Sequence, residues 1–182
     1  MASTTTTSPA DTPIFTKLAK NGDFRLEAQQ ASFIHSFEPS TSQLKRFGYT
    51  EGGSDERNAA LLIAITGSVP MNGFLKQKID IPKGGRVAAR LMYNHLEAPQ
   101  DRQFECNMIM TIRGELVASA PANVRDRWMT LEGEVDMDAG EADLMVTFEC
   151  IATRGDFFVV VDQIVVSDEA SLQDLDRVKF VY

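Results

Sequence analysis

The chain has 182 residues, of which 43% are hydrophobic and 24% charged, so it is long enough to bury the core of one domain. Its 18 lysines and arginines are outnumbered by 26 aspartates and glutamates, which gives a net charge of −8. Nucleic acids and anionic lipid surfaces both require a basic face on their protein partner. The charge balance therefore argues against a nucleic-acid partner and against a membrane partner.

The N-terminal residues 1–12 are rich in serine and threonine, and we expect them to be disordered. They show no basic region followed by an apolar run, unlike a secretory signal. No apolar stretch of the sequence is long enough to span a bilayer. These features favour a cytoplasmic protein, with residues 13–166 forming its single domain.

The sequence contains two cysteines, Cys106 and Cys150, which lie in apparent strands far apart in the chain. Buried cysteines behave as small hydrophobic residues. We therefore expect two buried thiols, in keeping with a reducing compartment. A bridge between adjacent strands stays open as the alternative.

From residue 24 onward, apolar and polar residues alternate with period two, which is typical of β-strands. Turn residues such as Pro82-Lys83-Gly84-Gly85 and Arg113-Gly114 separate the alternating runs. Strands are expected at 24–33, 59–66, 74–81, 86–95, 104–112, 128–137, 143–151 and 157–166. Many short strands separated by such turns predict an all-β fold, either a sandwich or a barrel.

Two segments depart from the alternation. Residues 36–58 are polar and contain glycine, which predicts a long loop able to act as a lid. Residues 167–182 predict a short acidic helix, with Ser167 as its N-cap, followed by a C-terminal arm. The arm could pair with a sheet edge of its own chain or of a second copy, which leaves a homodimer open.

Several motifs, in this order, resemble those of the jelly rolls of carbohydrate-binding modules and galactose-binding-like domains. Asn21-Gly22-Asp23-Phe24 is similar to the family's first strand. Leu75-x-Gln77-x-Ile79-x-Ile81 is similar to its hairpin strand. The motifs that follow in the family's order are Cys106-x-Met108-x-Met110, Trp128, Leu144-x-Val146-x-Phe148 and Val161-Asp162-Gln163-Ile164. The resemblance covers residues 21–166 and implies an all-β fold, an eight-stranded antiparallel jelly-roll β-sandwich of the galactose-binding-like kind.

The resemblance also implies a structural calcium site near the first and last strands, where Asp162 matches a family position. Arg25 stands where the family usually has an acid, and a guanidinium opposes calcium binding. We therefore expect no metal and no cofactor, and Asp162 is expected to be a hydrogen-bonded buried acid.

Sugar-binding members of the family stack pyranose rings on exposed tryptophan or tyrosine side chains. Trp128 and Tyr93 are both expected in the core here, and Tyr182 lies in the tail. Tyr49, in the expected loop, is the one left for stacking. The sequence therefore offers few exposed aromatic side chains on which a sugar ring could stack.

Alternation places every second residue of a strand on the core side and the others on the opposite side. If the strands that carry Arg90, Asn107 and Met145 share one concave sheet, their outward residues enclose an apolar hollow edged by polar groups. The alternative is an ordinary half-solvated sheet face. The residues expected at the hollow are Arg90, Asn94 and Asn107 as catalytic candidates, and Phe74, Lys76, Met92, Ile109, Met145, Glu149, His35 and Tyr49 as substrate-binding candidates.

Motifs for zinc, phosphate or serine-nucleophile chemistry are absent from the sequence. Small stand-alone proteins that resemble this fold include cofactor-free cyclases of fungal natural-product pathways, Diels–Alder and hetero-Diels–Alder catalysts among them. The resemblance implies a pericyclase that preorganises a polyketide-like or terpenoid-like small molecule, with Arg90 donating to a carbonyl oxygen. The alternatives are a non-catalytic carbohydrate-binding or lectin-like module and a protein-interaction module.

Overall fold

The computed structural model describes residues 34–38, 43–50, 60–68, 71–97, 106–122, 127–150 and 154–175. Side chains are described within 74–95, 106–122, 127–149 and 159–175. The strands in these ranges are β1 (Ile34–Glu38), β2 (Gln43–Thr50), β3 (Ala60–Ser68), β4 (Met71–Ile81), β5 (Gly85–Glu97), β6 (Cys106–Ile112), β7 (Glu115–Pro121), β8 (Met129–Met137), β9 (Gly140–Cys150) and β10 (Arg154–Ser167). One short helix follows them, α1 (Leu172–Leu175).

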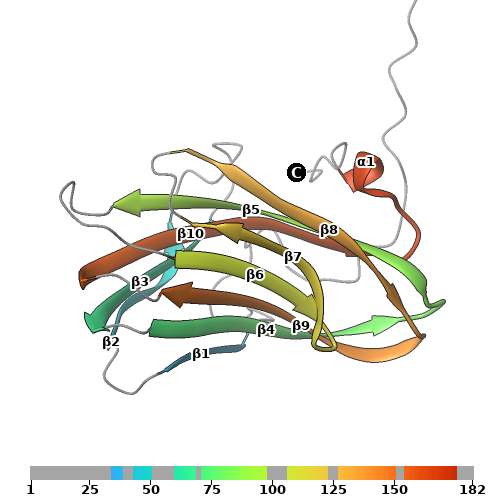
Figure 1. Cartoon of the computed structure of the whole chain (residues 1–182), viewed down its shortest axis with the longest axis horizontal. Coiled ribbons are helices and arrows are strands. Elements are labelled where there is room, and N and C mark those ends of the chain that lie inside the picture. Colours follow the sequence, from blue (N-terminus) through green and yellow to red (C-terminus); the bar gives the residue numbers. More distant parts are fainter. Residues whose placement is uncertain are drawn as a thin grey trace, which may run out of the picture.

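The strands form two layers (Figure 1). Sheet A has the strand order β1-β4-β9-β6-β7, and sheet B has the order β2-β3-β10-β5-β8. Every recorded strand pair is antiparallel. The predicted all-β antiparallel sandwich is confirmed. The expected strand at 24–33, the N-terminal segment 1–12 and the arm beyond residue 175 lie outside the described residues.

The prediction of one long loop over residues 36–58 is wrong where the structure describes this region. Residues 36–38 belong to β1, which pairs with β4 in sheet A. Residues 43–50 form β2, which pairs with β3 in sheet B. The register of β2 shifts between Leu44 and Arg46, and such a bulge interrupts the period-two alternation that would have identified the strand.

Strand β7 was also not expected. It pairs with β6 across the turn at Arg113-Gly114, with a register shift between Met110 and Thr111. Its backbone lies very close to β8, because a Cβ on Gly133 would stand 2.0 Å from the carbonyl oxygen of Val117. The edge strand of sheet A therefore packs against the edge strand of sheet B where only glycine fits.

The main core lies between the sheets and consists of the inward residues predicted from the alternation. In β5, Val87, Ala89 and Leu91 are fully buried. The inward residues of β4, β6 and β9 join the same core, and they include Leu75, Ile79, Ile81, Met108, Met110, Ile112, Leu144, Val146 and Phe148. Removing these apolar side chains from water supplies the main driving force for closing the two sheets.

Two aromatic residues expected in the core differ in their placement. Tyr93 is 1% exposed and lies in the main core, as predicted, with its hydroxyl donating to the carbonyl of Pro121 at 3.3 Å. Burial raises the pKa of this phenol. Trp128 is half-buried and packs against Val160, apart from the main core. Asp162 is fully buried and accepts a hydrogen bond from the backbone N–H of Gln163 at 2.7 Å, which confirms its expected role.

The expectation of two buried thiols is corrected by the structure. Cys106 is buried in the main core and is disulfide-bonded. The other cysteine of the sequence is Cys150, whose backbone is paired with that of Cys106 across β6 and β9. Sequence alone could not decide between thiols and a bridge, because the pairing of two distant strands is not encoded in local alternation.

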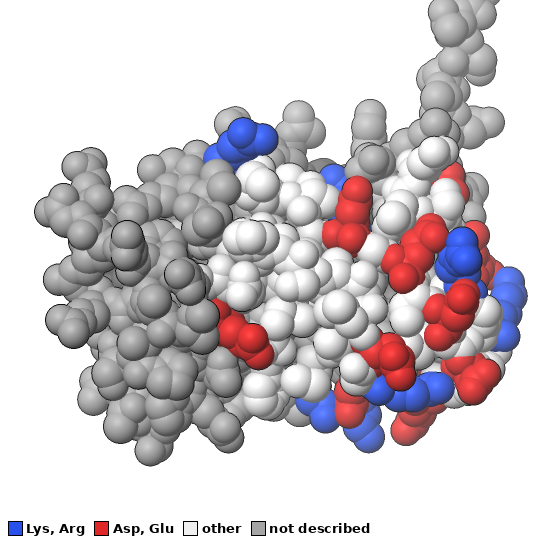
Figure 2. All heavy atoms as spheres, viewed as in Figure 1, with Lys and Arg blue, Asp and Glu red and all other residues white. Residues whose placement is uncertain are grey.

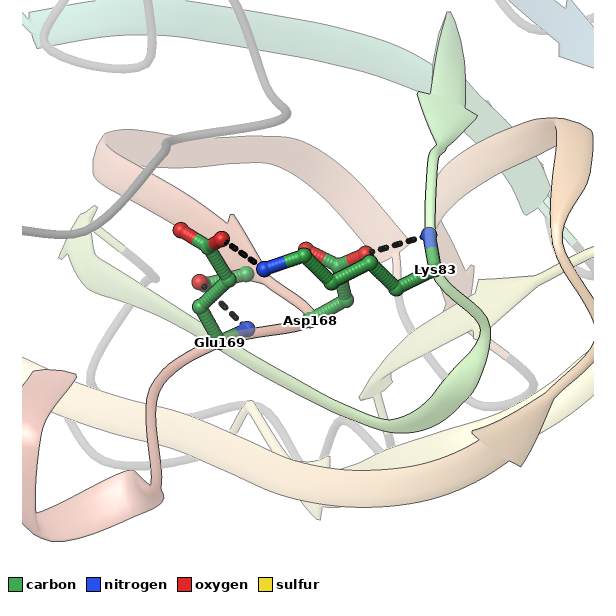
Figure 3. Close-up of polar contacts among 4 residues, drawn as sticks. Lys83, Asp168 and Glu169 are labelled. Carbon is green, nitrogen blue, oxygen red and sulfur yellow. Dashed lines mark hydrogen bonds and ion pairs between the residues drawn. The ribbon is translucent and has the colours of Figure 1, made fainter.

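Residues 168–175, called here the C-terminal strap, lie against the outer side of sheet B, with α1 beside β5 and β8 (Figure 1). Leu175 is fully buried against Ala88 and Val165. The side chains of Lys83 and Glu169 form an ion pair, and the backbone N–H of Lys83 donates to Asp168 at 3.1 Å (Figure 3). The small apolar cluster around Leu175 and the polar contacts of Lys83 therefore both join the strap to the sandwich.

Within the segment expected to hold a short helix, the structure describes a single helical turn, α1, which begins later than expected because β10 continues to Ser167. Ser171 acts as the N-cap in place of Ser167. The hydroxyl and backbone N–H of Ser171 both donate to Asp174 Oδ2, at 2.7 and 3.1 Å, so this carboxylate reaches back to the N-cap as in one half of a capping box. No helix in the described part of the chain has the length and apolarity needed to cross a membrane.

Candidate functional site

The outer side of sheet A carries a continuous set of side chains from three adjacent strands. Because Leu75, Met108 and Leu144 point into the core, their alternating neighbours point outward. We call this set the sheet A face. Its members are Phe74, Lys76, Lys78, Asn107, Ile109, Thr111, Asp143, Met145, Thr147 and Glu149.

The strand register arranges the sheet A face in rows. Phe74 of β4 and Ile109 of β6 flank Thr147 of β9. In the next row, Met145 lies between Lys76 and Thr111, and its neighbours on β4 and β6 are therefore polar. At one end of the face, Asn107 is opposite Glu149. The face thus combines half-buried apolar side chains with polar groups on the same surface.

A hollow of about 300 Å³ opens at the other end of this face, where β9 begins and the β6–β7 turn lies. Its lining residues are Lys78, Arg113, Gly114, Glu141, Ala142, Asp143 and Met145. Figure 2 shows side chains of both charges interspersed at one end of the molecule, beside a largely uncharged central surface. The hollow offers donors and acceptors around an apolar side chain, that of Met145.

The carboxylate of Asp143 is partly neutralised within the sheet A face. Its Oδ2 lies 2.7 Å from the Nζ of Lys76, and the two side chains are about one-third exposed, at 38% and 32%. Its Oδ1 is buried and makes no hydrogen bond within the part of the chain that the structure describes. Asp143 therefore keeps an acceptor oxygen that has no recorded donor.

Arg113 is held at the rim of the hollow by an uncommon backbone conformation. Arg113 and Gly114 have φ values of 53° and 85°, as a tight two-residue hairpin turn requires. An arginine in the left-handed region costs about 1–2 kcal/mol relative to the ordinary helical region. Its Nη2 donates to the backbone carbonyl of Glu141 at 2.9 Å, and its backbone N–H donates to Asp143 O at 2.9 Å. The side chain is thereby oriented across β9.

Six of the predicted site residues are brought together on the sheet A face: Phe74, Lys76, Asn107, Ile109, Met145 and Glu149. Sequence reasoning missed the hollow itself, whose polar residues Lys78, Arg113, Glu141 and Asp143 were not among the candidates. The Arg113-Gly114 pair was identified only as a turn. Its position beside Asp143 depends on pairing between strands that alternation does not reveal.

The expected grouping of Arg90, Met92 and Asn94 with Asn107 is wrong. Strand β5 belongs to sheet B, where it pairs with β10 and β8. The outward residues of β5 therefore lie on the opposite side of the sandwich from Asn107. Alternation correctly predicted which side of each strand faces the core, but it does not say which strands share a sheet.

Arg90 takes part in holding the C-terminal strap. Its Nη1 donates to the backbone carbonyl of Leu175 at 3.1 Å, and its Nε lies 3.9 Å from Glu132 Oε2. The Arg90 side chain is 16% exposed, and Asn94, further along β5, is also buried, at 8%. The contacts of Arg90 favour a structural role on this side of the molecule.

His35 and Tyr49, both expected at the hollow as substrate-binding candidates, lie on different sheets. His35 is in β1, opposite Leu75 in the register of sheet A. Tyr49 is in β2, opposite Leu61 in the register of sheet B. Their side chains lie outside the described set. Within the described ranges, no three histidine, cysteine, aspartate or glutamate side chains gather as a metal site.

Comparison with known proteins gives likeness in structure only. No protein-family model and no curated protein sequence matches the chain. A solved structure of TmCBM61 in complex with β-1,4-galactotriose superposes with a TM-score of 0.53 at 12% identity, over 83% of this chain and 97% of that one. A structure described as showing the promiscuous specificity of carbohydrate-binding modules from the β-sandwich superfamily gives 0.51 at 15% identity, over 87% and 64%.

A third structure contains the CBM22-1 and GH10 modules of a Clostridium thermocellum xylanase, Xyn10B, complexed with xylohexaose. It superposes with a TM-score of 0.56 at 8% identity and covers 87% of this chain but only 30% of the xylanase chain. At such low identities the likeness concerns the fold alone. The chain therefore has a jelly-roll β-sandwich of the kind found in carbohydrate-binding modules.

Proposed function

We propose that this protein is a non-catalytic carbohydrate-binding module whose ligand lies on the sheet A face and reaches into the hollow. One observation carries the proposal: the hollow of about 300 Å³ has cationic donors and carboxylate acceptors around Met145, on the outer surface of a sandwich of this fold. Residues expected from the sequence to bind a small molecule, Lys76 and Met145 among them, lie in the same rows.

Neutral sugars match the polar groups of the hollow. Each sugar hydroxyl can donate one hydrogen bond and accept others, so a ring with several hydroxyls requires donors and acceptors side by side. Lys78 and Arg113 supply donors, and Glu141 and Asp143 supply acceptors. Because Lys76 already pairs with Asp143, this carboxylate is held in place before a ligand arrives.

The apolar residues of the sheet A face provide surface for the C–H side of a sugar ring. Phe74 is half-buried and lies in the row of Thr147 and Ile109, one row from Met145. Flat aromatic and apolar side chains favour contact with such C–H surfaces over contact with water. Phe74 takes the role of the exposed tryptophan or tyrosine on which sugar-binding members of the family stack a pyranose ring.

The cyclase reading is supported less well. It requires the Arg90 guanidinium and Asn107 in one cavity, and these residues lie on opposite sides of the sandwich. Arg90 instead contacts Leu175 and Glu132. A binding function needs only the surface that the sheet A face provides.

Titration calorimetry with β-1,4-galactotriose and xylohexaose, the sugars held by two of the similar structures, tests the proposal. We expect at least one of the two to bind, and we expect Lys78→Ala and Asp143→Ala each to weaken its affinity about tenfold, the loss of one or two hydrogen bonds to a charged group. Asp143→Ala also removes the ion pair with Lys76, so circular dichroism must show that the variant is folded.

Lys83→Ala and Arg86→Ala are the matched controls, because both remove an exposed cation away from the sheet A face. Their affinities should equal that of the wild type. Failure of both sugars to bind, or an equal loss of affinity in the control variants, would overturn the proposal.

A further inference from the structure

The disulfide of Cys106 lies at a defined place beneath the sheet A face. Cys106 is the first residue of β6 and is 2% exposed within the main core. Its backbone partner, Cys150, is the last residue of β9 and the chain's other cysteine. Opposed residues of antiparallel strands have Cα atoms about 4.5–5.5 Å apart, inside the range that a disulfide spans.

The residues next to these cysteines belong to the sheet A face. Asn107 follows Cys106, Glu149 precedes Cys150, and the two are paired in register. A disulfide between Cys106 and Cys150 would therefore tie β6 to β9 at the Asn107–Glu149 end. The hollow with Arg113 and Asp143 lies at the opposite end of the same two strands, where β6 ends and β9 begins.

We propose that Cys106 and Cys150 form a structural disulfide in the mature protein, that the protein accordingly works in an oxidising compartment, and that the bond fixes the Asn107–Glu149 end of the sheet A face. Such bonds persist in secreted, cell-surface and periplasmic proteins and are rare where glutathione keeps thiols reduced. This inference does not depend on sugar binding, and it replaces the expectation of a cytoplasmic protein with two thiols.

Formation of the bond requires a disulfide oxidant, such as glutathione disulfide or the active-site disulfide of a thiol oxidoreductase. The two cysteine thiols lose two electrons and two protons as the S–S bond forms. The oxidant's own disulfide gains them and becomes two thiols. Because Cys106 is buried, a reductant's thiolate cannot reach the Cys106 sulfur in the folded protein.

The first experiment counts thiols in the wild-type full-length chain, produced by a secreting host and purified without reductant. We expect no maleimide labelling after denaturation, and an intact mass two hydrogen atoms below that of the reduced chain. Dithiothreitol should leave native protein unlabelled and should expose both thiols once denaturant is added. Two labelled cysteines in the unreduced denatured protein would overturn the proposal.

The second experiment compares the wild type with the Cys106→Ala/Cys150→Ala variant by thermal unfolding. Removing a disulfide that closes a long loop should lower the unfolding midpoint by roughly 5–15 °C in a domain of this size. Glu149 and Asn107 amides should lose hydrogen-exchange protection in the variant, while the Asp143 amide keeps its protection. Equal midpoints would contradict a structural role, and the thiol count remains decisive if the variant does not fold.

The third experiment concerns the compartment. An antibody against the protein, applied to fractions of the native host, should detect it in the secretory, surface or extracellular fraction, with its cysteines oxidised. Detection in the cytosol with both thiols free would overturn the inference, whatever the outcome of the sugar titrations.

Discussion

The Nη1 of Arg90 donates to the backbone carbonyl of Leu175 at 3.1 Å, and this hydrogen bond joins sheet B to the last turn of the described chain. Leu175 is fully buried on Ala88 and Val165, so the contact combines a charged donor with an apolar anchor. The residue that sequence reasoning placed in a reaction site thus stabilises the C-terminal strap.

Arg90→Ala should therefore reduce the free energy of unfolding and leave ligand binding intact. Loss of a hydrogen bond from a charged donor to a partly buried carbonyl costs about 1–3 kcal/mol. Urea unfolding monitored by circular dichroism measures the change. Arg86→Ala is the control, since the Arg86 side chain is 68% exposed and its ion pairs should contribute under about 1 kcal/mol. The prediction would be contradicted if Arg90→Ala were folded and as stable as the wild type but failed to bind sugar. Arg90 would then be a ligand-binding residue.

The sequence predicted the inward and outward sides of β5, β6 and β9 correctly, because burial imposes period two on each strand separately. It could not predict that β5 joins sheet B while β6 joins sheet A. That division depends on pairing between segments far apart in the chain, such as Asp162 of β10 opposite Met92 of β5. The proposed site changed for this reason, although most of the strand positions did not.

Strands β2 and β7 were not predicted from the sequence, for reasons that lie in their local sequence and pairing. Each contains a register shift, after Leu44 in β2 and opposite Met110 in β7, which breaks the alternation of apolar residues. Strand β7 also carries small residues such as Ala118 and Ala120, which have little strand preference of their own. Tertiary packing against the neighbouring strands, not local sequence, determines these two elements.

Gly133→Ala should destabilise the protein more than any exposed substitution on β8. The added Cβ would stand 2.0 Å from the backbone carbonyl oxygen of Val117, so β7 and β8 would have to separate. Overpacking of this kind costs about 2–3 kcal/mol. Chemical denaturation of Gly133→Ala beside Thr130→Ala, an exposed change on the same strand, measures the difference. Equal stability of the two variants would show that β7 does not pack on β8 as described.

Stability should fall in alkaline solution, in part through Tyr93. Burial raises the pKa of this phenol above its ordinary value of 10.0. Since the native state holds the proton more tightly than the unfolded chain does, stability is complete below the ordinary pKa and is lost as the pH rises through the raised one. Tyr93→Phe should therefore lose less stability than the wild type over this interval, although it gives up the hydrogen bond to Pro121, worth about 1 kcal/mol at neutral pH.

Lys83 also makes the stability fall as the pH rises. Its hydrogen bond to Glu169 and the Glu169 charge raise the pKa of the Lys83 ammonium. The double variant Tyr93→Phe/Lys83→Met should show the flattest alkaline profile in thermal unfolding. A Tyr93→Phe profile as steep as that of the wild type would assign the alkaline loss to other groups.

Arg113 offers a substitution that separates stability from binding. At a φ of 53°, glycine adopts the turn conformation without the cost that arginine incurs, so Arg113→Gly relieves backbone strain. The same change removes the hydrogen bond from Nη2 to Glu141 O, an exposed contact worth about 1 kcal/mol. The two effects oppose each other, and we expect the unfolding midpoint to change little.

Sugar affinity should respond differently, because Arg113→Gly removes a donor from the rim of the hollow. Calorimetry should show affinity about tenfold weaker, a loss of about 1.4 kcal/mol. Arg113→Lys retains a cation there and should bind with intermediate affinity, although it lacks the planar guanidinium. Unchanged sugar affinity in Arg113→Gly would exclude the guanidinium from the binding site. A strongly lowered unfolding midpoint would show instead that Arg113 stabilises the β6–β7 turn.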